Sequence, residues 1–453
     1  MDAGIGIGGL SIGKDEIASS KFNLFSPIEI EKGVEKSYSL TLRPISAVGS
    51  KGPFTFDIPA DPEKFTDIET LLLHGRIRIR KKVSGALTNL PPNEKVSTVN
   101  NIFDSLWSSI NVELNGTAIN DPSTKWYAYK AYFEKLLSFT TATKDTVLSS
   151  SGYYQDEAGE YDSLDNVSNS TVSTNDGYIQ RKDMFKESQW VYFCTNLHID
   201  LTTLRKVLPP NINITIKLNR NSDAFCLLSP NSVTNYEIEI QDLKITLERY
   251  TLSPTIENMY QNALKGGKKP LLPMDRSLLK TYTKQIGTSD LSHYNIISGR
   301  QLPEQILLAI VDENAHDGEI KKNPFNFKDF GVSEASLVVN GEHEPHDLYR
   351  LNLIEGDKID LYKSFLQNTG VSANEDREFG VSLGDYYNGC FILAWDRTPD
   401  KCNRYHTHEM GAGTIDVNLK TRTPLPNAAR IIVYATYSSY IQIEGDKIIT
   451  PVF

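Results

Sequence analysis

Two stretches decide the fold: "VNNIFDSLWSSINVELNG" (Val99–Gly116) and "NPFNFKDFGVSEASLVVNG" (Asn323–Gly341). In each, an aromatic-rich lead-in passes into alternating apolar and polar residues and ends in an Asn-Gly pair. The alternation predicts a strand with one face on a core, and Asn-Gly is typical of a two-residue hairpin turn. The pairs begin at Asn115 and Asn340, 340 − 115 = 225 residues apart in a chain of 453 residues. The sequence therefore predicts two copies of one β-rich unit.

Other landmarks extend this duplication. An amphipathic helix is predicted after each turn, over Trp126–Phe139 and over Gly356–Asn368. A second pair of landmarks, Leu208 and Leu425, each precedes a predicted strand, 425 − 208 = 217 residues apart. A third Asn-Gly pair, Asn388-Gly389, predicts a further hairpin turn. Many strands and few helices predict an all-β chain built of two sandwiches or jelly rolls.

The same patterns divide the chain into four parts. We predict an N-terminal arm and lead-in over residues 1–52, a first unit over 53–252 and a second unit over 278–453. Residues 253–277 carry Pro, Gly and Lys without strand alternation, which predicts a linker. The Ser-, Thr- and Asn-rich stretch Thr140–Gly177 predicts a surface loop, placed at 140–187, that contributes little core.

Composition excludes several classes of protein. Apolar residues make up 39% and charged residues 23% of the chain, as in a soluble globular protein, and the longest apolar run, Ile306–Val311, is too short to cross a bilayer. A net charge of −10 argues against unaided nucleic-acid wrapping. No secretory signal pattern is present, so four glycosylation sequons are interpreted as chance matches: Asn115, Asn166, Asn169 and Asn213. Four cysteines without a C-x-x-C spacing predict reduced thiols inside a cell: Cys194, Cys226, Cys390 and Cys402.

The glycine-rich start "GIGIGGLSIGKD" (Gly4–Asp15) resembles a phosphate-binding loop in part. A dinucleotide site needs a strand before its glycines, and a P-loop needs Ser or Thr after its lysine. The chain places only three residues before Gly4, and Asp15 follows Lys14. We therefore interpret this stretch as a flexible arm that docks on a neighbour.

Histidines suggest two metal sites. In "YHTHE", His406 and His408 fall on one side of a strand, as in the H-x-H motif of cupins, but Glu409 is immediately adjacent and position 400 is Asp where cupins have Gly. Solvated loop histidines are the favoured interpretation. In "GEHEPHD" (Gly341–Asp347), a polar loop is favoured over a metal site built from His343, His346, Glu342 and Glu344.

Basic residues alternate in "GRIRIRKK" (Gly75–Lys82), where Arg76, Arg78 and Arg80 share one face. Pairing with the acids of "YEIEIQD" (Tyr236–Asp242) is favoured over nucleic-acid contact, and "KGGKKP" (Lys265–Pro270) is a weaker basic candidate. No G-x-S-x-G or cysteine-nucleophile motif occurs. We therefore predict no catalytic, cofactor-binding or metal-binding residues and no enzymatic activity.

The chain resembles the major capsid proteins of Polinton/Maverick elements and adintoviruses. Four stretches carry the resemblance, which runs from about Phe54 to the C-terminus: Val99–Gly116 with the helix after it, Val311–Gly341, "DYYNGCFILAWDRTPD" (Asp385–Asp400) and "IIVYATY" (Ile431–Tyr437). It implies an all-β double jelly roll, two tandem eight-stranded jelly rolls with short helices in the loops.

The resemblance also implies a biological role. Three chains would form a pseudo-hexagonal capsomer that tiles an icosahedral shell, with loop 140–187 on its outer face. Expected partners are other copies of the chain and a penton or minor capsid protein, with no small-molecule substrate, cofactor or membrane span. The chain would lie in the virion and, during assembly, in the host nucleus or cytoplasm. A bicupin-type metal-dependent enzyme using His406 and His408, or a carbohydrate-binding β-sandwich protein, remain the alternatives.

Overall fold

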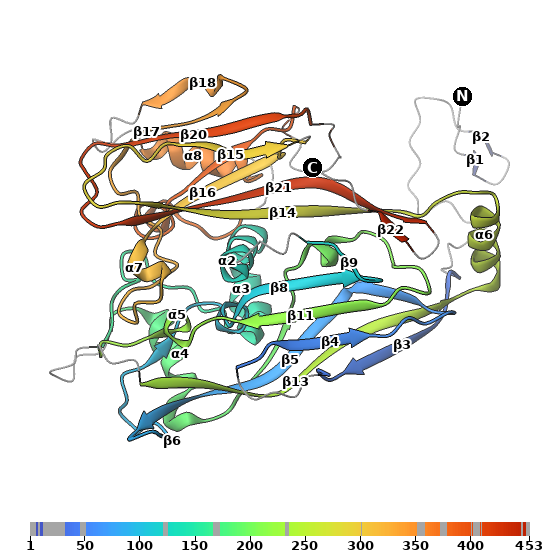
Figure 1. Cartoon of the computed structure of the whole chain (residues 1–453), viewed down its shortest axis with the longest axis horizontal. Coiled ribbons are helices and arrows are strands. Elements are labelled where there is room, and N and C mark those ends of the chain that lie inside the picture. Colours follow the sequence, from blue (N-terminus) through green and yellow to red (C-terminus); the bar gives the residue numbers. More distant parts are fainter. Residues whose placement is uncertain are drawn as a thin grey trace.

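The computed structural model describes residues 6–7, 10–11, 32–45, 51–120, 126–165, 173–231, 235–299, 301–350, 358–371, 378–399, 401, 408, 410–444 and 447–449. Most of the regular structure in these ranges is β-sheet (Figure 1). Among the described residues, no helix is both long and apolar enough to cross a bilayer.

The first half of the chain folds into two antiparallel sheets that face each other. One has the strand order β10-β5-β13-β3, and the other has the order β4-β11-β8-β9. Their alternating residues, such as Ile77 and Ile79 of β5, are fully buried between the sheets. The strands are β3 (Val34–Leu42), β4 (Phe54–Ile58), β5 (Phe65–Val83), β8 (Trp107–Leu114), β9 (Thr117–Ala118), β10 (Val191–Asn196), β11 (Ile214–Arg220) and β13 (Tyr236–Leu252).

The second half repeats this arrangement. Its sheets have the orders β14-β21-β16-β19 and β15-β20-β17-β18. Strand β16 is buried along almost its whole length, because "ILLAIV" is covered on both faces. The strands are β14 (Leu271–Lys284), β15 (His293–Gly299), β16 (Gln305–Asp312), β17 (Val332–Val339), β18 (Glu342–Arg350), β19 (Ile392–Asp396), β20 (Gly413–Thr421) and β21 (Ala429–Glu444).

Both halves have jelly-roll topology. Numbering the eight strands of each half in chain order, strands 1, 8, 3 and 6 form one sheet, and strands 2, 7, 4 and 5 form the other. Two sheets in this order enclose one hydrophobic core. The predicted fold class, two tandem eight-stranded jelly rolls, is confirmed.

Short elements fill the connections. Helix α2 (Tyr127–Ser138) lies between the two jelly rolls, and helix α6 (Pro254–Lys265) joins them at one end (Figure 1). The other short strands are β1 (Gly6–Ile7), β2 (Leu10–Ser11), β6 (Ala86–Thr88), β7 (Ser97–Thr98), β12 (Leu227–Leu228) and β22 (Lys447–Ile449). The other helices are α1 (Ile102–Ser105), α3 (Thr141–Thr146), η2 (Val147–Ser151), α4 (Asp176–Met184), η3 (Lys186–Ser188), η4 (Asp200–Thr203), α5 (Asp223–Cys226), α7 (Glu313–His316), α8 (Lys358–Asn368) and α9 (Leu383–Tyr387).

Two of the three predicted Asn-Gly turns are hairpin turns. Asn115 and Gly116 have φ of 47° and 76° between β8 and β9, and Asn340 and Gly341 have φ of 51° and 89° between β17 and β18. Positive φ at both central residues is the signature of a type I′ turn. The third prediction is wrong, because Asn388 has φ of −130° and ends helix α9.

Both predicted helices are confirmed as α2 and α8, each in the connection between the fifth and sixth strands of its jelly roll. The pairing of Leu208 with Leu425 is wrong. Leu208 precedes β11, the seventh strand of its unit, whereas Leu425 precedes β21, the eighth strand of the other. A Leu-Pro turn before a strand is a local signal that can precede any strand, so it does not identify equivalent strands.

Two further expectations need correction. The stretch Thr140–Gly177 contributes to the core, because Tyr153 and Tyr161 are buried, as is Tyr178 directly after it. The predicted linker 253–277 also contains strand structure, since β14 begins at Leu271. Pro273 is accommodated there because β14 lies at a sheet edge, paired only with β21 among the described strands.

Candidate assembly surfaces and the search for a chemical site

The residues of the predicted "YHTHE" metal site are only partly described. His406 and Glu409 lie outside the described residues. His408 is half-buried, and its backbone N–H donates a hydrogen bond to the Glu304 carboxylate at 3.3 Å. In the described ranges, no group of three His, Cys, Asp or Glu side chains is placed to hold a metal ion.

The stretch "GEHEPHD" is part of strand β18 and is not the polar loop that we expected. His343 Nδ1 lies 3.1 Å from the Ser336 hydroxyl on the paired strand β17. Glu344 accepts hydrogen bonds from the Arg397 guanidinium, with a shortest distance of 2.8 Å. The His346 side chain lies outside the described residues. These partners make the stretch a polar edge strand.

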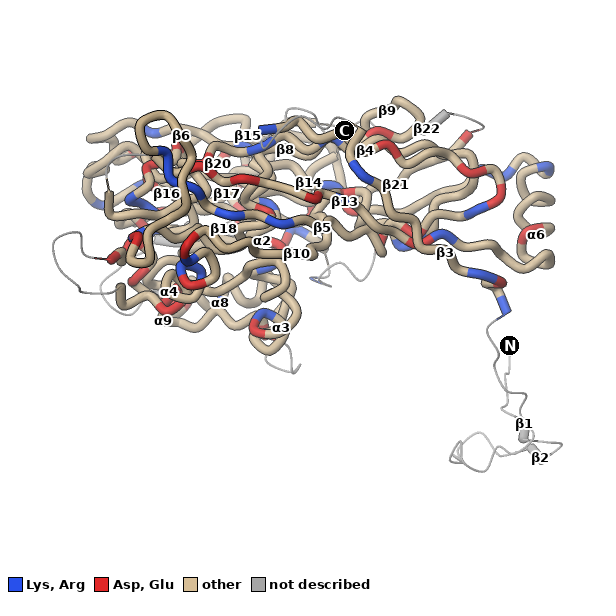
Figure 2. Tube along the Cα trace, turned by 90° about the horizontal axis from the view of Figure 1, so that it is seen from below, with Lys and Arg blue, Asp and Glu red and all other residues tan. Residues whose placement is uncertain are grey.

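The arginine face of β5 pairs with the neighbouring strand, as the favoured interpretation predicted. Arg78 forms an ion pair with Glu239 of β13 at 2.8 Å, and Arg76 forms one with Asp242 at 2.8 Å. Trp190 stacks beneath both guanidinium groups, 4.7 Å from Arg76 and 4.3 Å from Arg78. The charge of this face is therefore balanced within the sheet. Figure 2 shows the same interspersion of basic and acidic residues over the body.

The described cysteines are poor candidates for catalysis. Cys194, Cys226 and Cys390 are free thiols, as predicted, and Cys402 lies outside the described residues. Burial raises the pKa of the Cys390 thiol to about 12, although the Tyr161 hydroxyl 2.9 Å away opposes the shift. A thiol that stays protonated at neutral pH is a weak nucleophile.

Two clefts have volumes of about 520 and 560 Å³. The first is lined by charged residues together with apolar ones such as Leu90, Val96 and Phe185, and the second is lined mostly by polar and charged residues. In the described part of the chain, neither lining includes Ser, Cys or His. The glycine-rich start is only partly described: Gly6 belongs to the two-residue strand β1, while Gly4, Gly8, Gly9, Gly13, Lys14 and Asp15 lie outside the described residues.

The most developed feature of the molecule is the contact between the two jelly rolls. Aromatic side chains of α2 pack against the second unit: Tyr132 stacks on Phe325 with ring centroids 4.3 Å apart, and Phe133 stacks on Phe327 at 5.3 Å. Phe133 also contacts the Tyr434 ring of β21 at 5.9 Å. All of these rings are buried. Aromatic burial of this kind holds the two units together as one block.

Buried charges reinforce this contact. The Arg181 guanidinium donates to Asp156 at 2.5 Å, and both side chains are fully buried. Asn323 of the second unit donates to the other Asp156 oxygen at 3.0 Å. A buried carboxylate needs several donors to offset the loss of water; here Arg181 and Asn175 donate from the first unit and Asn323 donates from the second.

Helix α2 also carries a charged cluster that reaches both units. Lys130 pairs with Asp200, which accepts a hydrogen bond from Ser277 of β14 at 2.7 Å. Glu134 accepts hydrogen bonds from His198 and Tyr434, each at 2.8 Å. Burial favours a higher pKa for Glu134, but the Lys130 charge and the His198 and Tyr434 donors outweigh it and lower the pKa to about 2. The cluster is structural, since every group has a partner.

Exposed apolar side chains mark surfaces that other molecules can cover. Tyr192 on β10 and Tyr294 on β15 are 70% and 79% exposed. Ile286, in the connection between β14 and β15, is 65% exposed, and Met259 of α6 is 67% exposed. No single motif in the sequence marks these positions, because exposure is decided by what the rest of the chain leaves uncovered.

Comparison with known proteins places the fold. No family model matches the chain. Among curated proteins, the chain is 22% identical over 409 residues to the uncharacterized Caenorhabditis elegans protein F54H12.2, covering 88% of this chain and 93% of that one.

Solved structures of viral capsid proteins share the architecture. A chain of the Sputnik virophage matches with a TM-score of 0.63 at 14% identity over 98% of this chain and 94% of that one. The Faustovirus major capsid protein gives 0.59 at 9% identity over 94% of each chain, and the mavirus major capsid protein gives 0.51 at 12% over 98% and 96%. The fold is therefore the double jelly roll of these capsid proteins.

Proposed function

We propose that this chain is a major capsid protein of the Polinton/Maverick and adintovirus type. Three copies form a pseudo-hexagonal capsomer, and the capsomers tile an icosahedral shell. The proposal is supported by the resemblance of the sequence to that family and by a fold shared, over nearly the full chain, with capsid proteins of Sputnik, Faustovirus and mavirus.

The observation that carries the proposal is the buried contact between the two jelly rolls. The α2 aromatic cluster and the Asp156–Arg181–Asn323 network join the two units through buried side chains. A block of two similar units repeated about a threefold axis presents six similar faces to its neighbours. A hexagonal outline then follows from a trimer.

The parts of the chain take roles within this proposal. The first jelly roll runs from β3, which lies within the predicted lead-in 1–52, to β13, and the second runs from β14, which begins within the predicted linker 253–277, to β21. Helix α6 connects them, and the residues before β3 are the arm. Loop 140–187 lies on the outer face of the shell. Partners are other copies and a penton or minor capsid protein, and the chain resides in the virion and, during assembly, inside the host cell.

The role is structural and not catalytic. The described thiols are partly or fully buried, the linings of the two clefts contain no Ser, Cys or His among the described residues, and the arginine face of β5 is paired with acids. The bicupin hypothesis depends on His406, which lies outside the described residues, and it stays a prediction.

Negative-stain microscopy and sedimentation of the purified full chain test the proposal. We expect particles of three-chain mass with a triangular or hexagonal outline, and closed shells under assembly conditions. A chain that stays monomeric at every concentration, or that purifies with stoichiometric iron, manganese or zinc, contradicts the proposal.

A further inference from the structure

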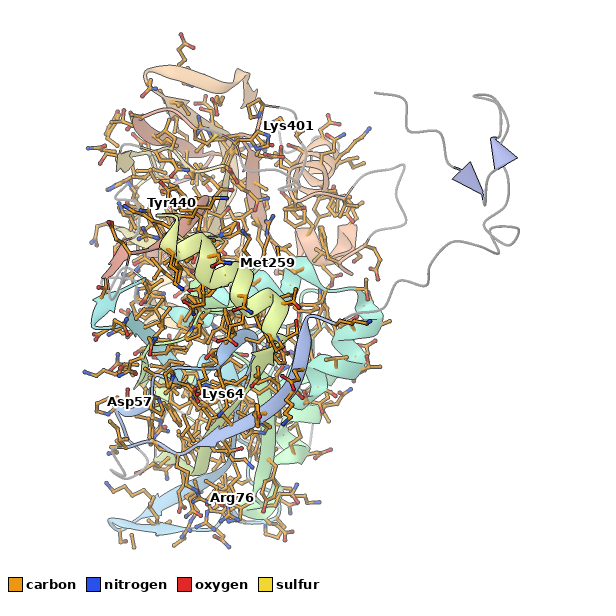
Figure 3. All side chains as sticks on the ribbon, turned by 90° about the vertical axis from the view of Figure 1, so that its right-hand side faces the viewer. Asp57, Lys64, Arg76, Met259, Lys401 and Tyr440 are labelled. Carbon is orange, nitrogen blue, oxygen red and sulfur yellow. The ribbon has the colours of Figure 1, made fainter. Side chains whose placement is uncertain are left out.

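One end of the molecule carries a cluster of exposed apolar side chains, which we call the α6 patch: Ile256, Met259, Leu264, Leu271 and Tyr440. None of the twelve residues of α6 is buried, and Met259 is 67% exposed. In Figure 3 the helix crosses this end of the molecule, with Met259 on it and Tyr440 beside it. Clustered apolar exposure of this kind marks a surface that is covered by a partner.

Helix α6 and the residues after it contact the body of the molecule. The Tyr260 ring packs edge-on against Phe65 with centroids 5.4 Å apart. The chain after the helix is tied to β21 by an ion pair between Lys269 and Glu444 at 2.8 Å. Only one acid and one base, Glu257 and Lys265, lie on α6. A helix that binds anionic membranes is rich in Lys and Arg, so α6 does not have that composition.

The chain itself supplies a segment that starts beside the patch. The Ser253 N–H, at the start of α6, donates a hydrogen bond to the Gly33 carbonyl at 2.9 Å. Gly33 therefore lies at the start of α6, and the residues before Lys32 are covalently joined to the body there. Ten extended residues span about 33 Å, and a helix of twelve residues is about 18 Å long. The segment is long enough to run along the whole helix.

The composition of that segment fits an apolar surface. "KFNLFSPIEI" (Lys21–Ile30) has large apolar side chains at Phe22, Leu24, Phe25, Ile28 and Ile30. Its charges, from Lys21 and Glu29, cancel, as do those of α6. A segment tethered beside its site has an effective concentration in the millimolar range, so a modest apolar contact suffices to hold it.

We propose that Lys21–Ile30 docks on the α6 patch of its own chain. The segment covers Met259 and braces the connection between the two jelly rolls. This docking does not depend on the proposed capsid role, because it takes place within a single chain.

A disulfide trap tests the contact in the full chain. Phe25→Cys combined with Met259→Cys is expected to form a disulfide within one chain under mild oxidation, seen as a shifted monomer band on a non-reducing gel. Each single variant is the control for reaction with the native cysteines. A double variant that forms only dimers, or no new disulfide, overturns the proposal.

Limited trypsin digestion gives an independent measurement. Because docking shields the bond after Lys21, Met259→Glu is expected to speed that cleavage about tenfold, the factor that corresponds to a loss of 1.4 kcal/mol of docking free energy. The variant retains the fold, because α6 has no buried residue. The matched control is Ile286→Glu, equally exposed beyond the other end of β14, with no change expected. Equal cleavage rates in both variants contradict the docking.

Discussion

The Tyr434 hydroxyl of β21 donates a hydrogen bond to Glu134 of α2 at 2.8 Å, across 300 residues of sequence. This bond joins the last long strand of the second jelly roll to a helix inserted in the first. It is made to a partly buried carboxylate, and hydrogen bonds to charged groups are stronger than those between neutral groups. Because the bond spans the two units, removing it changes the free energy of unfolding by the amount that this contact contributes.

Removing the Tyr434 hydroxyl tests the strength of this contact. Tyr434→Phe leaves Glu134 with one donor fewer, and we expect the free energy of unfolding to fall by roughly 1.5–3 kcal/mol. Chemical denaturation of the full chain measures the change. Tyr294→Phe, at a ring that is 79% exposed, is the control and is expected to have no effect. Equal stability of the two variants would show that Tyr434 contributes nothing.

The lowered pKa of Glu134 predicts a pH dependence. Its pKa is about 2 in the folded chain against an ordinary value of 4.5, so the stabilisation is complete above pH 4.5 and is lost as the pH falls toward 2. We expect Glu134→Gln to be much less stable than the wild type at pH 7 and to differ little from it near pH 2. Denaturation across this range is the measurement, with the exposed Glu113→Gln as control. A difference independent of pH contradicts the assignment.

Asp156 is expected to be essential to the contact between the units. Asp156→Ala leaves Arg181 fully buried without its carboxylate and removes the acceptor for Asn323. Breaking a buried ion pair in this way costs roughly 3–5 kcal/mol. Thermal unfolding measures the loss, and Asp183→Ala, at an exposed position on the same helix as Arg181, provides the comparison. A small effect would mean that the pair is not needed to hold the units.

Gly389 is a position where only glycine fits. Its φ is +129°, and an added Cβ would lie 2.2 Å from the Tyr161 ring, which belongs to the other half of the chain. Gly389→Ala is therefore expected to destabilise the chain by roughly 1–3 kcal/mol or more through overpacking. Gly411→Ala, where nothing lies within 4 Å of the added atom, is the control. Denaturation midpoints that match within error would refute the steric argument.

The N-terminal arm is expected to act in shell assembly and not in trimer formation. Deleting residues 1–20 keeps Lys21–Ile30 and both jelly rolls, so we expect intact trimers and fewer closed particles. A terminal arm that gains order on binding adds contacts between neighbours without supporting the fold of the subunit. Counting closed particles by electron microscopy measures the effect. Equal yields with and without the arm would refute it.

Local sequence patterns determined some features of this structure, and tertiary packing determined others. The sequence alone determined the type I′ turns at Asn115 and Asn340, the strands that alternate with period two, and the helices α2 and α8. These features depend on backbone preferences and periodicities that act over a few residues. The basic face of β5 was also interpreted correctly, because the matching acids of β13 alternate in the same way.

Only the tertiary structure decided which strands are equivalent and which polar segments are buried. Leu208 and Leu425 precede strands at different places in their jelly rolls, although their local sequences are alike. Tyr161 lies in a stretch that is polar on average, yet it is buried because Gly389 and Cys390 of the second unit cover it. Burial depends on residues that lie hundreds of positions away in the sequence, and no local pattern specifies which of them will pack against a given side chain.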